Sequence, residues 1–320
     1  MTIRQRQVIY KSPRRVAARM ISLMSSRVRI FQVDAFTDTP LTGNPAGVVP
    51  DADGLSAAQM QAIARELNNS DTAFLLRADA PDHDLKVRFF TPRAETGFVG
   101  HATVALHAVL ASVGRSARRQ QQRTGLVLVD VDNGPPPAVS VHQAPPPLQA
   151  VLAAQPQAQI LAALGVTAAD LDERCPPQFA GSTGNRLLVG VRNGAVLARL
   201  TPDLPRLAAL SAQHGASGYF LFTREPSLAG VDTEARMFCP ALGFAEDPVS
   251  GNAHAMLGVY LHARALLPTA GDRAVLLGAQ GHHLGRPGRV RIELALKTGR
   301  VESVTMVGHA VIAFETMLAC

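Results

Sequence analysis

The feature of this sequence that most constrains its fold is an internal duplication. The pattern Asp-x-x-x-Arg-x-Phe-x-Pro at residues 84–92 returns at residues 232–240, a constant offset of 148 residues. Three further landmarks occur in the same order in both copies: Thr-Gly-Asn at 42–44 and 183–185, a strand-like run at 72–76 and 218–222, and Gly-[His/Asn]-Ala at 100–102 and 251–253. A period this long is not that of a solenoid. It predicts two similar domains that face each other.

The apolar patterns predict mixed α and β structure in each copy. Val28–Phe36 alternates apolar and polar residues, as a half-buried strand does, and Ser56 with Gln59 forms a capping box before a helix. Residues 101–112 and 253–265 are apolar on nearly every side, which predicts helices buried all round. A helix sheathed by strands satisfies that requirement, so we expect an α+β fold of two pseudo-symmetric domains.

Two triple-proline runs place the domain boundary. Residues 135–137 and 145–147 are all proline, and such runs fit neither a helix nor the middle of a sheet. We therefore predict a basic tail at 1–27, a first domain at 28–143 and a second at 148–305. The last strand is a candidate to return to the first domain, with residues 306–320.

The charge distribution argues against nucleic acid as a partner. The pI is near 9.8, but residues 1–29 hold eight basic residues and no acidic one. Removing these eight charges from the net charge of +6 leaves −2 for the remainder, so the folded body is nearly neutral. No apolar run is long enough to span a bilayer. We expect neither a nucleic acid nor a membrane as a partner.

The basic tail has three readings. Arg-rich, Ser-containing and acid-free, it resembles a transit peptide, it is also compatible with a disordered arm, and Met20 or Met24 can be nearer the true start. We favour a start-site artefact or simple disorder. The three cysteines, Cys175, Cys239 and Cys320, show neither a disulfide framework nor a metal-ligand spacing, which fits a reducing cytoplasm.

The duplicated glycines suggest an anion site. Gly100 and Gly251 each start a buried helix, and a helix N-terminus attracts carboxylates through its unpaired N–H groups and its dipole. Each glycine alone is explained as well by helix packing. Their recurrence at equivalent places favours a shared cleft that holds one small acid.

Acid–base candidates surround these helix starts. Asp71 lies between a helix end and a strand, and its counterpart region at 216–218 has no acid, as expected for a single general base; a solvated turn residue is the bland alternative. His101 can cap its helix or move protons. Asp247 can cap the second helix, orient His101 or orient a substrate ammonium.

Several motifs in combination resemble the phenazine-biosynthesis PhzF-like (PhzF/YddE) family. They stand at residues 43–48, 69–74, 90–92, 100–103 and 246–253, with 280–281 and 286–287 as a C-terminal match, so that the resemblance covers roughly residues 28 to 315. It implies the diaminopimelate-epimerase fold, in which two pseudo-symmetric domains each wrap a β-barrel around one helix. Members are commonly homodimers.

The resemblance also implies a chemistry. In the epimerases a cysteine precedes each helix, whereas Val99 and Ser250 stand there in this chain, which disfavours two-thiol racemisation. In PhzF a glutamate carries the proton during isomerisation of dihydro-hydroxyanthranilic acid. Asp71 stands at that position and is one methylene shorter, which disfavours that particular substrate.

We therefore expect a cofactor-independent isomerase of a small carboxylate-bearing substrate. The implied roles are proton transfer by Asp71, proton relay by His101 and orientation by Asp247. Substrate binding falls to Asn44, Gly100, Ser250, Gly251 and Asn252. The alternatives are a non-catalytic small-acid-binding homologue, and a racemase or epimerase that pairs Asp71 with a non-thiol partner.

Overall fold

The computed structural model describes residues 27–132, 134, 136–181 and 185–319. The tail predicted for residues 1–27 lies outside the described residues except for Arg27, which begins the first strand. Thr183 and Gly184, part of the second Thr-Gly-Asn, also lie outside them. Within the described ranges, no helix is both long enough and apolar enough to cross a membrane.

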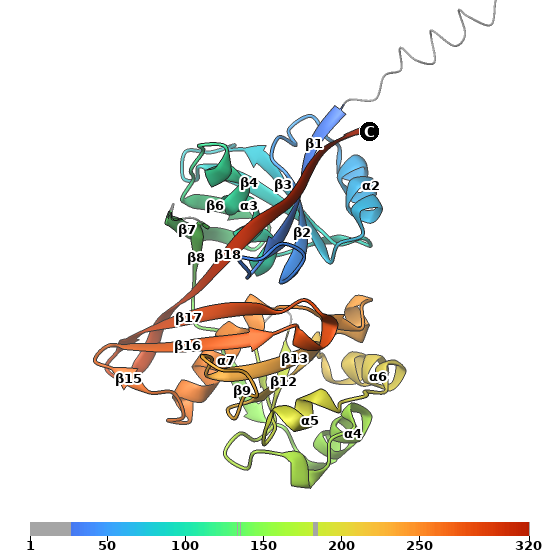
Figure 1. The fold of residues 1–320 in the computed structure, drawn as a ribbon, viewed down its shortest axis with the longest axis vertical. Helices are drawn as coiled ribbons and strands as arrows, with labels where there is room; N and C mark the ends of the chain where they lie inside the picture. The colour runs from blue at the N-terminus through green and yellow to red at the C-terminus, as the bar shows by residue number, and fades with distance from the viewer. Residues whose placement is uncertain (1–26, 133, 135, 182–184, 320) are drawn as a thin grey trace, which may run out of the picture.

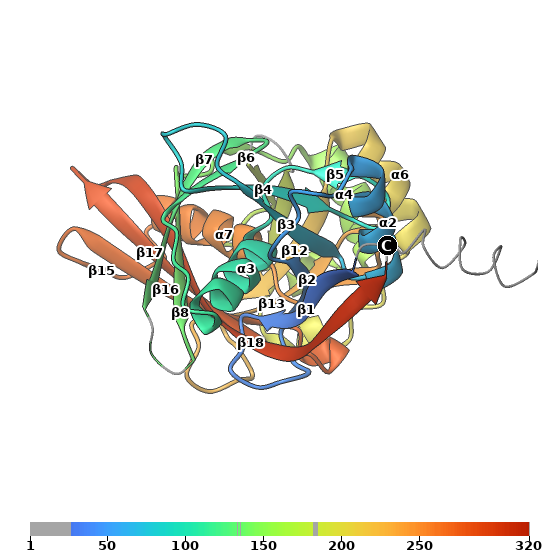
Figure 2. The same cartoon turned by 90° about the horizontal axis from the view of Figure 1, so that it is seen from above.

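Strands of the first half surround one helix, α3 (Gly100–Ser112) (Figures 1 and 2). By their pairing, eight strands form a closed ring. Each strand pairs with the next, and the last pairs with the first. In ring order the strands are β1 (Arg27–Ala35), β2 (Asn44–Val49), β3 (Asp71–Arg77), β4 (Leu85–Phe90), β6 (Arg119–Gln122), β7 (Gly125–Asp132), β8 (Ala138–Gln143) and β18 (Arg300–Ala319).

The second half repeats this plan around α7 (Gly251–Ala263). Its strands follow the order β9 (Leu148–Val151), β10 (Gln178–Ala180), β11 (Arg186–Gly190), β12 (Gly218–Thr223), β13 (Thr233–Phe238), β16 (Arg273–Gln280), β17 (Gly288–Lys297) and β18. Among the residues that the structure describes, no pairing joins β18 to β9, so this second barrel-like sheet is open at that seam. The predicted fold class is confirmed.

Shorter elements complete the two halves. Helices α2 (Ala57–Leu67), α4 (Ala154–Leu164), α5 (Gly194–Ala198) and α6 (Leu204–His214) lie outside the sheets (Figure 1). The strands β5 (Glu95–Thr96), β14 (Glu246–Asp247) and β15 (Thr269–Ala270) and the 3₁₀ turns η1 (Ala168–Asp170), η2 (Pro240–Leu242) and η3 (His282–Leu284) are local. The capping box predicted for Ser56 and Gln59 is present at the start of α2.

The two central helices are buried on all sides because their residues are apolar on all sides. Every residue from Gly100 to Leu110 of α3 is buried, and so are ten of the thirteen residues of α7. Such a helix is stable in water only if other elements cover its whole circumference. The surrounding strands supply this cover, and the prediction of two sheathed helices is confirmed.

The repeated Asp-x-x-x-Arg-x-Phe motif proves to be structural. Asp84 accepts the backbone N–H of Arg119 at the start of β6, and Asp232 accepts that of Leu277 in β16, so each aspartate fixes the strand that runs parallel to its own.

The arginine of the motif holds the same partners in both halves. Arg88 makes a bidentate ion pair with Glu95 and lies over Phe90, while Arg236 pairs in the same way with Glu246 and lies over Phe238. We call each Arg–Glu pair a clamp. The first clamp ties the short strand β5 to β4 and the second ties the short strand β14 to β13, and β5 and β14 lead into α3 and α7.

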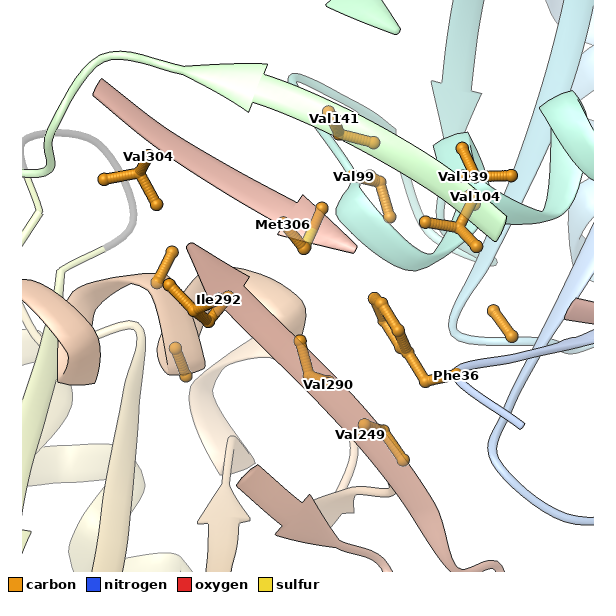
Figure 3. Packing of buried hydrophobic residues seen from close by; sticks show 14 of the residues in the cluster. Phe36, Val99, Val104, Val139, Val141, Val249, Val290, Ile292, Val304 and Met306 are labelled. Carbon is orange, nitrogen blue, oxygen red and sulfur yellow. The ribbon is translucent and has the colours of Figure 1, made fainter. Parts of the chain in front are cut away.

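Strand β18 belongs to both halves (Figure 1). Its first part pairs with β17, and its last ten residues pair with β1. Met306, near its middle, packs with Phe36 and Val99 in the apolar contact between the halves (Figure 3). Strand β18 thus pairs with strands of both halves, and the predicted domain division, with limits at 143, 148 and 305 and residues 306–320 completing the first domain, stays a prediction.

Candidate active site

The N-termini of the two central helices meet at the junction of the halves. The side chain of Met306 contacts both helix starts. A Cβ built on Gly100 would lie 2.9 Å from Cε of Met306, and a Cβ built on Gly251 would lie 2.0 Å from Sδ of Met306. Asn252 Oδ1 would be 3.3 Å from the same Cβ on Gly100. The helix starts can approach this closely only because both residues are glycine. Their N–H groups and dipoles therefore act on one small volume.

That volume is part of a cavity of about 360 Å³, which we call the cleft cavity. The described residues that line it come from both halves: Ser70, Asp71, Thr91, Arg93, Ala94, Glu95, Thr96, Phe98, Val99, Gly100 and His101 from the first, and Arg186, Met237, Ala241, Leu242, Phe244, Asp247, Ser250, Gly251 and Asn252 from the second. The structure thus brings together seven of the eight residues selected from the sequence. The eighth, Asn44, lies immediately behind Asp247.

Asp71 is the first residue of β3 and faces the cleft cavity beside His101. The carboxylate Oδ2 of Asp71 lies 3.8 Å from Nε2 of His101, and the Ser70 hydroxyl lies 3.2 Å from that same nitrogen. The Asp71 side chain is only 14% exposed. The alternative that Asp71 is a solvated turn residue is therefore wrong.

Asp247 approaches the cavity from the other half and is held firmly in place. Asn44 donates from its side-chain nitrogen to Asp247 Oδ1 at 2.7 Å and to the Val249 carbonyl at 2.8 Å. Gln280 donates to the Asp247 carbonyl at 2.6 Å and accepts the Ser250 N–H at 3.0 Å. Asn44 thus acts on the cavity through Asp247.

The helix cap is formed by Ser250. Its side chain accepts the N–H of Ala253, and it is the N-cap residue of α7. The capping role that the sequence allowed for Asp247 is therefore filled by Ser250, which caps α7. In the first half the N-cap position of α3 is Val99, which makes no side-chain cap, so the N–H groups there are left for other acceptors.

An arginine of the second half fixes the turn that carries Asn44. Arg286 donates to the carbonyls of Thr42 and Gly43 at 2.9 Å each, and to Asp34 Oδ1 at 2.5 Å. Gly43 adopts a φ of +63°, and a Cβ there would lie 2.3 Å from the Ala35 carbonyl oxygen. Only glycine fits this turn. The 42–44 turn and the Arg286 segment therefore position Asn44 jointly.

Burial dominates the ionisation of the cavity groups. It raises the pKa of Asp71 well above the usual carboxyl value, the negative charge of Asp247 raises it further, and a hydrogen bond from Ser70 opposes both. Burial likewise raises the pKa of Asp247 to about 6, while the charge of Arg186 and the hydrogen bond from Asn44 lower it. Burial lowers the pKa of His101 to about 3, so its imidazole is neutral at pH 7.

Comparison with known proteins places this arrangement in a family. The phenazine biosynthesis-like protein family matches residues 33–316, which is most of the chain. The chain belongs to this family. It is 39% identical over 290 residues to the uncharacterized isomerase YddE of Escherichia coli K12, covering 89% of this chain and 96% of that protein. It is 30% identical over 289 residues to the trans-2,3-dihydro-3-hydroxyanthranilate isomerase of Pseudomonas aeruginosa, covering 88% and 95%.

Solved structures of the family share the fold. A PhzF-family protein of Bacillus anthracis superposes with a TM-score of 0.82 at 25% identity, covering 92% of this chain and all of that one. A predicted epimerase of Pseudomonas aeruginosa, PA4716, superposes with a TM-score of 0.76 at 26% identity, covering 92% and 99%. This chain is thus a PhzF-like isomerase of epimerase-like fold.

Four residues near the site of this PhzF-like protein were not selected from the sequence. The Ser70 hydroxyl contacts His101. Gln280 hydrogen-bonds to the backbone of Asp247 and Ser250. Arg93 and Arg186 are the positively charged side chains among the described residues that line the cleft cavity. Ser70 and Gln280 stand inside family motifs, which was the available signal. The two arginines belong to no motif, and only the folded chain shows that they face the cleft.

Proposed function

We propose that this chain is a cofactor-independent isomerase that moves a proton between two carbon atoms of a small carboxylate-bearing substrate in the cleft cavity. The observation that carries the proposal is the position of Asp71. Its carboxylate is sequestered from water, lies beside a neutral imidazole and stands in the cavity at which two helix N-termini converge. A base beside a site for developing negative charge is what proton abstraction next to a carboxylate requires.

The reaction follows from these groups. The substrate carboxylate lies against the N–H groups at Gly100, Gly251 and Asn252. Asp71 takes a proton from a carbon atom, so that a C–H bond breaks and an O–H bond forms, while the electron pair moves into the conjugated system. The helix N-termini stabilise the charge that develops. Asp71 then returns the proton to a second carbon atom, and the double bond has migrated.

The environment suits the assigned roles. A raised pKa makes Asp71 a stronger base once it is ionised. His101 is neutral near pH 7, so it acts as a hydrogen-bond donor and proton relay to the substrate rather than as an imidazolium. Asp247, fixed by Asn44, orients the substrate, and Ser250 supplies a further polar contact at the start of α7.

The test uses proton exchange. The P. aeruginosa relative is named for trans-2,3-dihydro-3-hydroxyanthranilate, so this compound and a panel of small β,γ-unsaturated acids are incubated in D₂O and followed by NMR. The double bond should move, and deuterium should enter at the new C–H bond in those turnovers in which the proton held by Asp71 exchanges with solvent before it is returned. Asp71→Asn keeps the size and removes the base, and we expect at least a hundredfold loss of exchange. Exchange within a few-fold of wild type would refute the assignment of Asp71.

Asp71→Glu is the matched variant. It keeps the charge and adds the methylene that PhzF itself has at this position. If the shorter side chain has tuned the cavity to another acid, Asp71→Glu should gain activity on the anthranilate substrate and lose activity on the acid that wild type prefers.

An epimerase is the second candidate, and one observation favours it. Asp71 and Asp247 reach the cleft cavity from opposite halves, and the charge of Asp247 raises the pKa of Asp71. Two acids on opposite sides of one carbon atom suit inversion, with one removing a proton and the other supplying one. Deuterium found at the original carbon with inverted configuration and no double-bond shift would select this candidate.

The homodimer and the cytoplasmic location stay predictions. Sedimentation equilibrium of the purified full chain measures the first, and fractionation of the source cells measures the second.

A further inference from the structure

A second hollow lies beside the cleft cavity, and residues of both halves line it. Its volume is about 740 Å³, and we call it the arginine groove. It shares five lining residues with the cleft cavity: Thr96, Phe98, Arg186, Leu242 and Asn252. The groove therefore lies directly beside the place where a ligand would meet the helix N-termini.

The groove has a one-sided charge. Arg186 lines both the groove and the cleft cavity, and Arg123 lines the groove alone. None of the described residues that line the groove is acidic, although Asp71, Glu95 and Asp247 all line the cleft cavity beside it. The charge of Arg186 acts on Asp247 and that of Arg123 acts on Glu95, so both arginines stand between the acids of the cleft cavity and the groove. The field in the groove favours an anion.

Pseudo-symmetry shows how Arg186 comes to stand there. Thr72 pairs with Phe90 in the first half as Tyr219 pairs with Phe238 in the second, so Gly218 is the counterpart of Asp71. A Cβ on Gly218 would lie 3.2 Å from Cδ of Arg186. The arginine side chain therefore passes over the place where the first half carries its base.

The strands beside Asp71 and Gly218 show the same replacement of an acid by a cation. Across the parallel pair, Asp71 stands beside Ala46 in the first half, whereas Gly218 stands beside Arg186 in the second. One half thus presents an acid next to a small residue, and the other presents a cation next to a glycine. The duplicated fold has become electrically asymmetric at its two equivalent strand starts.

We propose that the substrate carries a second anionic group, which lies in the arginine groove against Arg186, with Arg123 adding to the attraction. The proposal rests on the proposed function, because it assumes that a first carboxylate binds at the helix N-termini. It narrows the substrate class to elongated diacids. An arginine guanidinium suits this role because its fork of donors pairs with planar acid groups.

The experiment compares two probes of equal length. Adipate carries two carboxylates, and its monomethyl ester carries one. Binding of each to the full chain is measured by isothermal titration calorimetry at pH 7 and low salt. We expect adipate to bind about tenfold more tightly than the ester, a difference of about 1.4 kcal/mol. Equal affinity of the two probes for the wild-type chain would overturn the proposal.

Substitutions assign the preference to the groove. Arg186→Gln should remove the preference for adipate and leave ester affinity within about twofold, while Arg123→Gln should reduce it by about threefold. Arg115→Gln is the matched control, because Arg115 follows the C-terminal end of α3, pairs with Asp51 on the surface and lines neither hollow. It should change nothing.

The outcomes separate the possible failures. If Arg186→Gln weakens both probes equally, Arg186 has a structural role and the proposal is wrong. If that variant does not fold, Arg123→Gln decides: an unchanged preference for adipate overturns the proposal. Because binding is measured without turnover, the result is independent of Asp71→Asn. Absence of the preference in the wild-type chain refutes the second anionic group alone, whereas retained exchange in Asp71→Asn refutes the proposed function alone.

Discussion

The contact between the two helix starts makes a sharp prediction about two glycines that look alike in the sequence. Gly100 and Gly251 both begin a buried helix, and both touch Met306. A methyl group on Gly251 would lie 2.0 Å from Sδ of Met306 and 2.7 Å from Cζ of Phe36. A methyl group on Gly100 would lie 2.9 Å from Cε of Met306, which is the free end of that side chain.

These distances set the expected magnitudes. Non-bonded carbon atoms rest at about 3.5–4.0 Å. Gly251→Ala therefore requires the Met306 sulfur to move by roughly 1.5–2 Å. Met306 is fully buried and Phe36 is 1% exposed, so neither has free space to enter. Overpacking of this kind costs about 1–3 kcal/mol, and we expect the upper end. Gly100→Ala needs a rotation about the Cγ–Sδ bond of Met306 and a small shift of its sulfur, which would lie 3.2 Å from the new methyl group, and should cost about 1 kcal/mol or less.

Urea unfolding followed by circular dichroism measures both costs, and the slope of each curve checks that the unfolded states are comparable. A third variant isolates the cause. In a Met306→Ala background the sulfur is gone, so Gly251→Ala should lose most of its cost there, which a double-mutant cycle reports. Equal midpoints for the two alanine variants, or a cost that persists without Met306, would refute the packing argument.

Three further perturbations test other parts of the structure. Glu246→Gln should lower the free energy of unfolding by about 3 kcal/mol, and Glu95→Gln by about 1 kcal/mol, as measured by urea unfolding. The reason is burial: the side chains of Arg236 and Glu246 are 11% and 9% exposed, whereas those of Arg88 and Glu95 are 26% and 29% exposed. Asn44→Ala removes a donor to Asp247, so the pKa of Asp247 should rise above about 6, and the acid limb of the pH–rate profile should move to higher pH. Burial lowers the pKa of His107 to about 4, so the unfolded chain binds the extra proton between pH 6.5 and 4, and stability should fall as pH falls through that window. His107→Gln should make this part of the urea midpoint curve less steep, while His101 and His254, whose pKa values burial also lowers, keep the rest of the slope.

The sequence predicted those features of the fold that local chemistry and repetition determine. The uniform apolarity of residues 101–112 and 253–265 required helices sheathed on every side, and α3 and α7 are buried in this way. Ser56 and Gln59 cap α2 as their spacing requires. The offset of 148 residues identified two equivalent halves, because the clamp residues of each copy make the same contacts.

Features that depend on distant partners did not follow from the sequence. The polar strand β6 (Arg119–Gln122) carries no apolar alternation, since its buried glutamines are satisfied by other side chains, with His107 and Thr103 bonding to Gln120. Helix α5 is only five residues long and has no full apolar period.

At the candidate site, too, the sequence failed to predict the residues whose position depends on distant partners. Asp71, His101 and Asp247 could be placed from family motifs, and the structure puts them in one cavity. Arg186 could not, because a strand-initial arginine gives no local sign of the direction in which its side chain runs. Its position depends on the missing side chain of Gly218, more than thirty residues away.

The shared strand β18 has a consequence for synthesis in the cell. Seven strands of the first ring are complete once Gln143 has been made, but the eighth begins at Arg300. At the usual rates of translation the chain between them takes roughly 8–30 s to emerge. Throughout that interval α3 is left partly uncovered, and the edges of β1 and β8 are unpaired beside it. The nascent first half therefore presents an open sheet edge to its neighbours, and it is a natural client for a chaperone on the ribosome until the last strand arrives.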